Sequence, residues 1–387
     1  MPFSAMGHTD SCLTIDLGAV IANWRYINSL SSAATTTAAV VKANGYGLGA
    51  NHVAGALAQV GCNKFFVANL SEAIDLRQHL DDLGYNQPQI MTLHGCYLHQ
   101  LEDHAEFRIT PVLNDLEQLS RWRMFGQQQS NKLPAMMHID TGMTRLGFDP
   151  DQIDWLIENK SALDGIDCRY VMSHLVSAEI SDDATNARQL DAFNEIRRCF
   201  AGIPASLANS AGSLLSAEYH FQMTRPGIAL YGAHPADIPT NKLKRVVTWR
   251  ARIVQLRHAK AGSRVGYGGT YILDRDARIA TIGVGYADGY NRKLGGKARV
   301  LIGAQTAPVI GRVSMDSITV DVTDIDPAYL QHGSVELLHN GYDLSRMAGD
   351  ADTIAYEILT QLGTRPTRHY QNAKKGINGS QKMEKSS

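Results

Sequence analysis

A lysine at the end of a strand-like run is the residue with the clearest chemical potential in this chain. Residues 37–41 are small or β-branched, Lys42 follows them, and a glycine-rich stretch, 45–49, comes directly after. An unpaired ammonium at the end of a buried strand costs free energy, so such a lysine is usually paired or used in chemistry. A desolvated lysine amine loses its proton readily enough to form a Schiff base. Lys42 is therefore a candidate attachment site for a carbonyl cofactor.

Two other interpretations of this segment remain open. The run Gly45-x-Gly47-x-x-Ala50 fits a dinucleotide-binding fingerprint. Glu72 lies at about the distance at which that fingerprint carries an acidic residue. The fingerprint gives Lys42 no role, however, and the rest of the chain does not suggest an open doubly wound sheet. The simplest alternative is a turn between a strand and a helix, with the lysine reaching outward to solvent.

The composition is that of an ordinary soluble enzyme. The chain has 387 residues, 44% hydrophobic and 19% charged, with a net charge of −1. This length allows two domains, and this charge argues against nucleic acid or a membrane as partner. The sequence shows no membrane-length apolar stretch and no secretory leader pattern, which predicts a cytoplasmic protein. The five cysteines are scattered, so neither a disulfide framework nor a metal site is expected.

Two patterns of secondary structure divide the chain. Between residues 37 and 235, strand candidates alternate with amphipathic helices, which favours a TIM-type (β/α)8 barrel. The strand candidates are 38–42, 64–68, 89–93, 109–113, 135–139, 169–174, 205–208 and 227–231. The clearest helix candidates, several with a Ser, Asp or Thr at the N-cap position, are 71–84, 115–125, 149–161 and 185–200.

After residue 240 the pattern changes to strands separated by turn residues, with one helix-like segment at 352–362. The strand candidates here are 246–255, 278–284, 298–302, 307–313 and 318–322. We therefore expect an α/β barrel domain over 11–240, a mostly β domain over 241–370 and a disordered tail over 371–387. Barrel enzymes carry their chemistry where strands end. The polar residues at or just past such ends are Lys42, Arg145, His174, Asn209 and Ser210.

With these residues in view, the chain resembles the alanine racemases, pyridoxal-phosphate (PLP) enzymes of fold type III built from a barrel and a β domain. Residues 40–47 are similar to the PLP-attachment signature of that family. Further blocks agree with the family in order and rough spacing: 140–147, 208–211, 225–232, 265–268, 285–290, 311–316 and 365–370. One block is weak evidence, but eight in order across residues 11–370 are strong.

The resemblance implies a two-base interconversion of L- and D-alanine. Racemisation takes the α-proton from one face and returns a proton to the other, so two bases on opposite faces are needed. The family assigns one base to Lys42, which also holds PLP, and the other to Tyr267 of the partner subunit. A tyrosine is a weak base unless it is assisted, and the family gives that task to His174 and Arg225.

Further roles are also implied by the resemblance. Arg225 is expected to contact the pyridine nitrogen of PLP, where a guanidinium remains a donor and leaves the ring a poorer electron sink. Arg145 and the backbone of Met315 are expected to hold the substrate carboxylate, and Tyr286 to narrow the entrance. The implied cofactor-binding residues are Lys42, Tyr46, Asn209, Ser210, Arg225, Gly227, Ile228 and Tyr370.

One position departs from the best-known pattern of the family. Where that pattern has a lysine that becomes carbamylated and orients the arginine, this chain has His138. Histidine cannot form that stable carbamate. Arg145 must therefore be oriented by an anion, a water molecule or a direct hydrogen bond, and the sequence leaves all three open.

The resemblance also implies a homodimer in which the β domain of one subunit completes the barrel site of the other, and a supply of D-alanine for peptidoglycan. A broad-specificity amino-acid racemase is the nearest alternative, although bulky Tyr286, Met315 and Tyr370 favour alanine. A decarboxylase of the same architecture would carry a cysteine motif and a glutamate for the ring nitrogen, and neither is apparent. A PLP-homeostasis protein would resemble the barrel alone, whereas Tyr267 and a second domain are present here.

Overall fold

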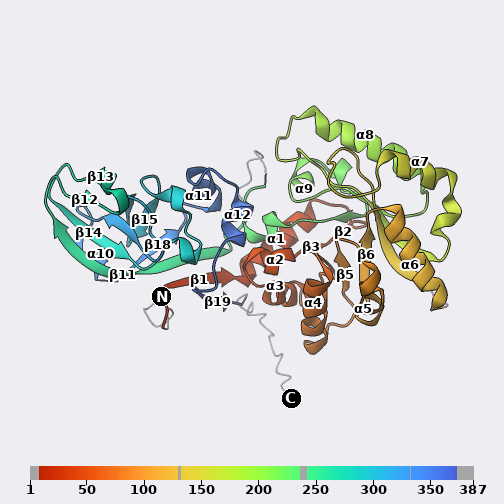
Figure 1. The fold of residues 1–387 in the computed structure, drawn as a ribbon, viewed down its shortest axis with the longest axis horizontal. Helices are drawn as coiled ribbons and strands as arrows, with labels where there is room; N and C mark the ends of the chain where they lie inside the picture. Colours follow the sequence, from red (N-terminus) through yellow and green to blue (C-terminus); the bar gives the residue numbers. More distant parts are fainter. Residues whose placement is uncertain (1–7, 130–131, 236–241, 332, 373–387) are drawn as a thin grey trace, which may run out of the picture.

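The structure is a computed structural model that describes residues 8–129, 132–235, 242–331 and 333–372. Figure 1 shows an elongated molecule with a barrel-like α/β part at one end and a β part at the other. No helix in these described ranges is both long and apolar enough to cross a membrane.

Parallel strands form the wall of the α/β part. Seven of them lie in sequence order in one sheet: β3 (Ala39–Val40), β4 (Lys64–Val67), β5 (Gln89–Thr92), β6 (Ile109–Leu113), β7 (Leu133–His138), β8 (Ile166–Met172) and β9 (Ala205–Ser206). The N–H groups of Gln222 and Arg225 donate to the carbonyls of Ala205 and Ala208, which brings β10 (Met223–Thr224) beside β9. Strand β10 pairs in parallel with β2 (Thr36–Thr37), which leads into β3, so the wall curls back on itself. The expected barrel-like α/β fold is confirmed.

The eighth strand is not where the sequence places it. Residues 228–231 form the 3-10 helix η5 (Ile228–Tyr231), and β10 takes the expected strand's place. The N–H groups of Gly227 and Ala229 donate to the Ser210 hydroxyl, and Leu230 N–H donates to the Gly227 carbonyl, which folds the segment into a turn. All four residues of η5 are buried, and a short run that is apolar on every side does not distinguish a strand from a turn of helix.

Helices cover the outside of the barrel, as Figure 1 shows. They are α1 (Leu17–Ser29), α3 (Ala50–Ala58), α4 (Leu70–Asp82), α5 (Leu101–Glu106), α6 (Leu116–Gln128), α7 (Pro150–Glu158), α8 (Ala184–Cys199) and α9 (Gly212–Leu215). Side-chain N-caps begin the helices that the sequence predicts most clearly. Asn69, Asp115, Asp149 and Asp183 each accept an N–H from the first turn of α4, α6, α7 and α8.

The β part contains an eight-stranded sheet in the order β14-β17-β16-β15-β18-β11-β1-β19. Its strands are β1 (Ser11–Asp16), β11 (Val247–Ala259), β14 (Ala277–Ile282), β15 (Arg299–Ile302), β16 (Gln305–Ile310), β17 (Ile318–Asp321), β18 (Ser334–Leu338) and β19 (Thr367–Gln371). Strand β1 precedes the barrel in the chain but pairs with β11 and β19 here, so both ends of the described chain enter this sheet. Of the predicted tail, Gln371 belongs to β19, and residues 373–387 lie outside the described residues.

Short elements complete the β part. The small hairpin β12 (Arg264–Val265) and β13 (Tyr271–Ile272) carries η6 (Tyr267–Gly269). A further short helix, α10 (Pro327–Leu330), precedes β18. The helix expected at 352–362 is present as α12 (Ala355–Thr360), and α11 (Leu344–Asp350) comes directly before it. The backbone of Asp352, at φ 56°, is left-handed and separates the two helices.

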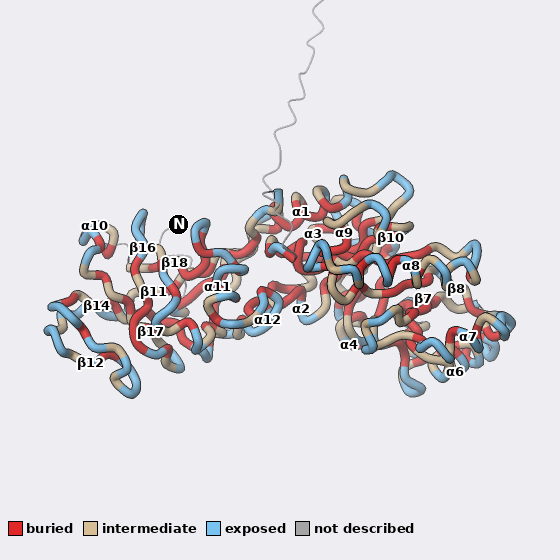
Figure 2. Tube along the Cα trace, turned by 90° about the horizontal axis from the view of Figure 1, so that it is seen from above, coloured by how far each residue is buried: buried red, intermediate tan, exposed pale blue. Residues whose placement is uncertain are grey.

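One buried apolar cluster extends through both parts. It includes Phe65 and Tyr231 of the barrel, Ile15 of β1, Trp249 of β11 and Leu359 of α12. Figure 2 shows buried segments in both parts and at the junction between them. The β part is therefore packed against the barrel through its own strands and through α12.

We expect Gly47→Ala to test the contact between the barrel and α12. Gly47 has φ 81°, and an added Cβ would overlap the carbonyl oxygen of Leu359. Gly61 is the matched control, because it has φ 97° and open space around the added carbon. Both substitutions should lose about 1–2 kcal/mol to the left-handed backbone. Gly47→Ala should lose roughly a further 1–3 kcal/mol through overlap, measured as the free energy of unfolding in urea. Equal losses would mean that α12 yields to the added methyl.

Candidate active site

A cavity of about 660 Å³ lies at the carboxyl ends of the barrel strands. It brings together many of the residues predicted from the sequence, from segments that are far apart in the chain. These are Lys42, Tyr46, Arg145, His174, Asn209, Ser210, Arg225, Gly227 and Ile228, and His138 also lines the wall. The arrangement follows from the topology, because parallel strands in a barrel all end on the same side.

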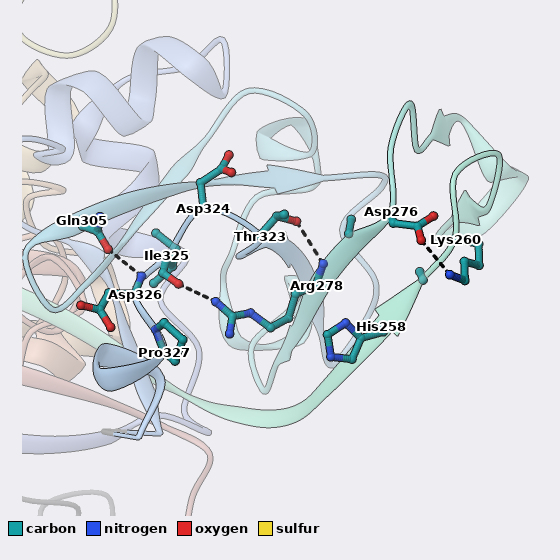
Figure 3. A pocket seen from close by; sticks show the side chains of 12 residues that line it. His258, Lys260, Asp276, Arg278, Gln305, Thr323, Asp324, Ile325, Asp326 and Pro327 are labelled. Carbon is teal, nitrogen blue, oxygen red and sulfur yellow. Dashed lines mark hydrogen bonds and ion pairs between the residues drawn. The ribbon is translucent and has the colours of Figure 1, made fainter.

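A second cavity, of about 730 Å³, lies in the β part (Figure 3) and contains none of the predicted site residues. Most of its charged groups are engaged with other side chains or with the backbone. Lys260 is paired with Asp276 at 2.7 Å, and Arg278 donates to the Ile325 carbonyl. We therefore place the active site in the barrel.

Lys42 begins a turn of unusual backbone geometry. The segment α2 (Lys42–Tyr46) is left-handed, with φ of 52° at Ala43, 52° at Asn44, 62° at Gly45 and 55° at Tyr46. The strand therefore ends before Lys42, rather than at Lys42 as the sequence predicts. Left-handed backbone costs about 1–2 kcal/mol for each residue other than glycine, so other contacts must hold this turn.

Glu72, in the first turn of α4, supplies such contacts. Its carboxylate accepts the Ala43 N–H at 2.7 Å and the Ala68 N–H at 2.8 Å, one on each oxygen. It thereby joins the segment after β3 to the segment after β4. Glu72, the acidic residue of the dinucleotide interpretation, is thus bound to the backbone. The strands around it curl into a barrel, whereas that interpretation required an open sheet.

The surroundings of Lys42 favour its neutral amine. Burial and the charge of Arg145 lower the pKa of Lys42, and Glu72 opposes them in part. A lower pKa increases the fraction of the nucleophilic amine at neutral pH. The geometry and the charge therefore both suit covalent attachment of a carbonyl group.

Arg225 and His174 lie deeper in the cavity. The guanidinium of Arg225 donates to the Ser206 hydroxyl and to the carbonyls of Ser173, at 2.5 Å, and Leu207, at 3.3 Å. Burial lowers the pKa of Arg225 to about 9, which still leaves it a charged donor at neutral pH. Burial and the charges of Arg225 and Arg145 hold the pKa of His174 well below its usual range, so its imidazole is neutral.

A group of donors and hydroxyls lies beside η5. The Ser210 hydroxyl accepts the N–H groups of Gly227 and Ala229 at 2.8 and 3.3 Å. A Cβ at Gly227 would overlap the Tyr46 hydroxyl, so glycine is required there for close approach. Burial raises the pKa of Tyr46, which keeps its hydroxyl protonated. Hydroxyls and a helix-like turn together suit a phosphate group.

The structure corrects one predicted residue of this group. Tyr370 on β19 stacks on His52, with ring centroids 3.7 Å apart, and its hydroxyl lies against Gly49 rather than at the cavity wall. Tyr356 of α12 lines the cavity instead, with its ring centroid 5.9 Å from that of Tyr46. In the sequence, Tyr356 lies in a segment distinguished only by its helical pattern, so it carried no signal for a cofactor site.

The other predicted residues lie on the surface of the β part. Tyr267, Met315 and Tyr286 are 69%, 53% and 45% exposed. The loops of Tyr286 and Met315 are joined by backbone hydrogen bonds from Tyr286 to Ser314 and from Ala287 to Met315. Figures 1 and 2 place the β12–β13 hairpin, which carries Tyr267, at the outer end of the β part, whereas α2 lies near the middle of the molecule, where the barrel meets the β part. A single chain therefore does not bring Tyr267 to Lys42.

The cavity fits a phosphorylated carbonyl cofactor. Lys42, Arg145 and Arg225 converge on it, and none of its lining residues in the described chain is an aspartate or glutamate. Such a site favours an anionic cofactor together with a carboxylate substrate.

Family comparison agrees with this geometry. Residues 15–235 match the alanine racemase N-terminal domain, and residues 246–370 match the alanine racemase C-terminal domain. This chain belongs to the alanine racemase family. The expected fold class and the expected enzyme class, an amino-acid racemase, are thereby confirmed.

Individual members of the alanine racemase family are similar along nearly the whole chain. Alanine racemase of Brucella suis is 43% identical over 372 residues, which cover 92% of this chain and 93% of that protein. A catabolic alanine racemase of Agrobacterium fabrum is 41% identical and covers 95% and 93% of the two chains. The crystal structure of the Bartonella henselae alanine racemase, with covalently bound pyridoxal phosphate, has a TM-score of 0.88 and 38% identity and covers 94% and 99%.

We expect Glu72→Gln to destabilise the turn that carries Lys42. Glutamine keeps one acceptor, but its NH2 group faces the N–H of Ala43 or Ala68 and donates where an acceptor is needed. Hydrogen bonds to a charged acceptor contribute about 1.5–3 kcal/mol, so the free energy of unfolding should fall by roughly that amount. Asp75→Asn is the control, since Asp75 is an exposed carboxylate on the same helix. The free energy of unfolding in urea is measured for both variants. Equal values for Glu72→Gln and Asp75→Asn would show that Glu72 does not hold the turn.

Proposed function

We propose that this chain interconverts L- and D-alanine with PLP bound to Lys42, using Lys42 and Tyr267 of the partner subunit as the two bases. The observation that carries this proposal is the convergence of a low-pKa lysine with two arginines in a cavity lined by no carboxylate. The covalently bound PLP of the Bartonella henselae relative supports the choice of cofactor.

Each part of the cofactor has a matching group in the cavity. PLP, when bound, withdraws electrons from the α-carbon and makes the α-proton acidic. Ser210, Tyr46 and Tyr356, with the backbone of Gly227 and Ile228, would hold the phosphate. Arg225 would donate to the pyridine nitrogen, because its three hydrogen bonds hold the guanidinium in place and leave other N–H groups free to donate. Asn209 lines the wall beside them.

The two faces of the α-carbon require two proton carriers. The neutral amine of Lys42 takes or returns the proton on one face. On the other face, the partner subunit's Tyr267 does so with the help of His174. The His174 ring makes no hydrogen bond to another described residue, and its neutral state leaves a lone pair for a tyrosine hydroxyl. Arg145, with the backbone of Met315, binds the substrate carboxylate.

A homodimer supplies the second base. Tyr267, Met315 and Tyr286 are exposed on the β part, while Tyr97 at the cavity wall is 50% exposed. A twofold dimer would bring the exposed β-part residues of one subunit, Tyr267 among them, onto the barrel mouth of the other. Two identical sites would result. Bulky Tyr286 and Met315 at that mouth favour alanine over larger amino acids. We further propose that the protein is cytoplasmic and supplies D-alanine for peptidoglycan.

We expect Lys42→Ala to lose both the covalent PLP and the first base. Borohydride reduction followed by mass spectrometry should find PLP on Lys42 in the unaltered protein and on no peptide of the variant. Racemisation should fall by at least about 10²–10⁴-fold, the usual contribution of a general base. The exposed Lys160→Ala is the control and should keep both properties. A Lys42→Ala protein that stays yellow and active would refute the proposal.

A mixing experiment tests whether the two bases come from different subunits. Lys42→Ala and Tyr267→Phe chains, each nearly inactive alone, are unfolded together and reassembled. Half of the dimers are then mixed, and each mixed dimer has one intact site, so about a quarter of the unaltered activity should return. If each site took both bases from the same chain, no activity would return.

The matched control dilutes the unaltered chain with an equal amount of the double variant Lys42→Ala/Tyr267→Phe. If the sites are composite, mixed dimers have no intact site, and about a quarter of the activity remains. If each site lies within one chain, about half remains. Differently tagged chains verify the reassortment in both mixtures.

A further inference from the structure

The imidazole of His138 is held by the protein on one side only. His138 ends β7, is 7% exposed and lines the active-site cavity. Its Nδ1 lies 2.9 Å from Oδ1 of Asn114. Its Nε2 makes no hydrogen bond to any other residue that the structure describes.

The partners of Asn114 determine which ring nitrogen of His138 carries the proton. The amide nitrogen of Asn114 donates to the carbonyls of Leu93, at 3.0 Å, and Val112, at 2.9 Å. These bonds use both amide hydrogens and fix the orientation of the amide, so Oδ1 can only accept. Nδ1 of His138 must therefore carry the hydrogen. In a neutral ring, Nε2 then has a free lone pair.

Burial, together with the nearby arginines, keeps the ring of His138 neutral. Burial lowers its pKa to about 3, Arg225 and Arg145 act in the same direction, and Asp140 opposes them. His174 is a further titratable neighbour, since the two rings are electrostatically coupled, and it is neutral as well. Nε2 is therefore an acceptor throughout the range in which an enzyme of this kind works.

The guanidinium of Arg145, which lines the cavity, has no acceptor among the described residues. Its loop is fixed by Asp140, which accepts the N–H groups of Gly142 and Met143 at 2.9 Å and of Thr144 at 3.0 Å. The guanidinium itself is exposed, and it has no hydrogen bond or ion pair with the rest of the described chain. A guanidinium has five N–H donors, so it can bind a carboxylate with two and still donate elsewhere.

We propose that His138 is a positioning residue: its Nε2 accepts one N–H of Arg145, and Asn114 sets the tautomer that makes this possible. The proposal rests on the proposed function, in which Arg145 binds the substrate carboxylate. Of the three ways of orienting Arg145 that the sequence left open, it selects the direct hydrogen bond. A bare lone pair at Nε2 would repel an anion bound in the same place.

The tautomer can be measured without any assay of activity. Long-range ¹H–¹⁵N spectra of the holoenzyme, labelled in its histidines, report which ring nitrogen carries hydrogen, and the His138 signals are those lost in His138→Gln. We expect the Nδ1–H form, unchanged between about pH 6 and pH 9. Arg145→Met should shift the Nε2 resonance of His138 through loss of the hydrogen bond. An Nε2–H tautomer, an imidazolium or an unmoved Nε2 resonance would overturn the proposal.

Kinetics with two substitutions of His138 separate positioning from packing. Glutamine offers a donor to Asn114 and an acceptor to Arg145, whereas methionine fills similar space with neither. His138→Met should raise KM for alanine about 10-fold or more and leave kcat within about threefold, the size of effect expected for one hydrogen bond to a charged group. His138→Gln should recover most of the lost affinity.

Equal KM values in the glutamine and methionine variants would overturn the proposal. A KM of the unaltered protein that falls as chloride is added would also overturn it, because an anion would then orient Arg145. If the methionine variant does not fold, Asn114→Leu replaces it, with the same expected rise in KM through loss of the fixed tautomer. If the protein racemises no amino acid, the proposed function fails while the spectra still test the tautomer.

Discussion

The left-handed turn after Lys42 is the constraint on which the site depends. Five consecutive residues, Ala43 to Gly47, have positive φ, and three of them are not glycine. Such a backbone is costly, so it persists only where the surroundings determine it. Glu72 holds its beginning, and Arg368 of β19 holds its end by donating to the Gly47 carbonyl at 3.1 and 3.2 Å. The attachment lysine is thus positioned by the barrel and by the β part together.

The second constraint is an excess of positive charge in the cavity. Lys42, Arg145 and Arg225 approach one another without a lining carboxylate, and each cation lowers the pKa of its titratable neighbours. Glu72 and Asp140 offset this positive charge only in part. A phosphate and a substrate carboxylate would supply the missing negative charge. The same three cations therefore give the cavity affinity for both groups. Burial and the same field keep His174 and His138 neutral, so both rings can accept hydrogen bonds.

Much of the fold could be predicted because local signals agreed with it. The strands β4 to β8 are short apolar runs bounded by turn residues, and side-chain caps begin the helices between them. The eighth strand could not be predicted, because β10 is two residues long, while the more apolar η5 beside it is a turn held by Ser210. Short strands of this kind are defined by their partners rather than by their own pattern.

The site was predictable to the extent that its residues lie at strand ends. Lys42, Arg145, His174 and Ser210 are examples, since the topology of a barrel gathers such residues on one side. Tyr356 reaches the same cavity from α12, which the β part contributes, and no periodicity in the sequence encodes that packing. The roles of Asn114 and Glu72 depend on hydrogen bonds between segments, which a residue type alone does not specify.

The packing of the β part also bears on the origin of the second base. Strand β1 lies in the large sheet between β11 and β19, and its last residue, Asp16, caps α1 of the barrel. The two parts also share one apolar core, to which Ile15, Tyr231 and Leu359 belong. A hinge motion that carried Tyr267 to Lys42 would have to break these contacts, whose buried side chains stabilise the chain by several kcal/mol. Since the proposed reaction requires a base on each face, an assembly of two chains meets that requirement without disturbing either core.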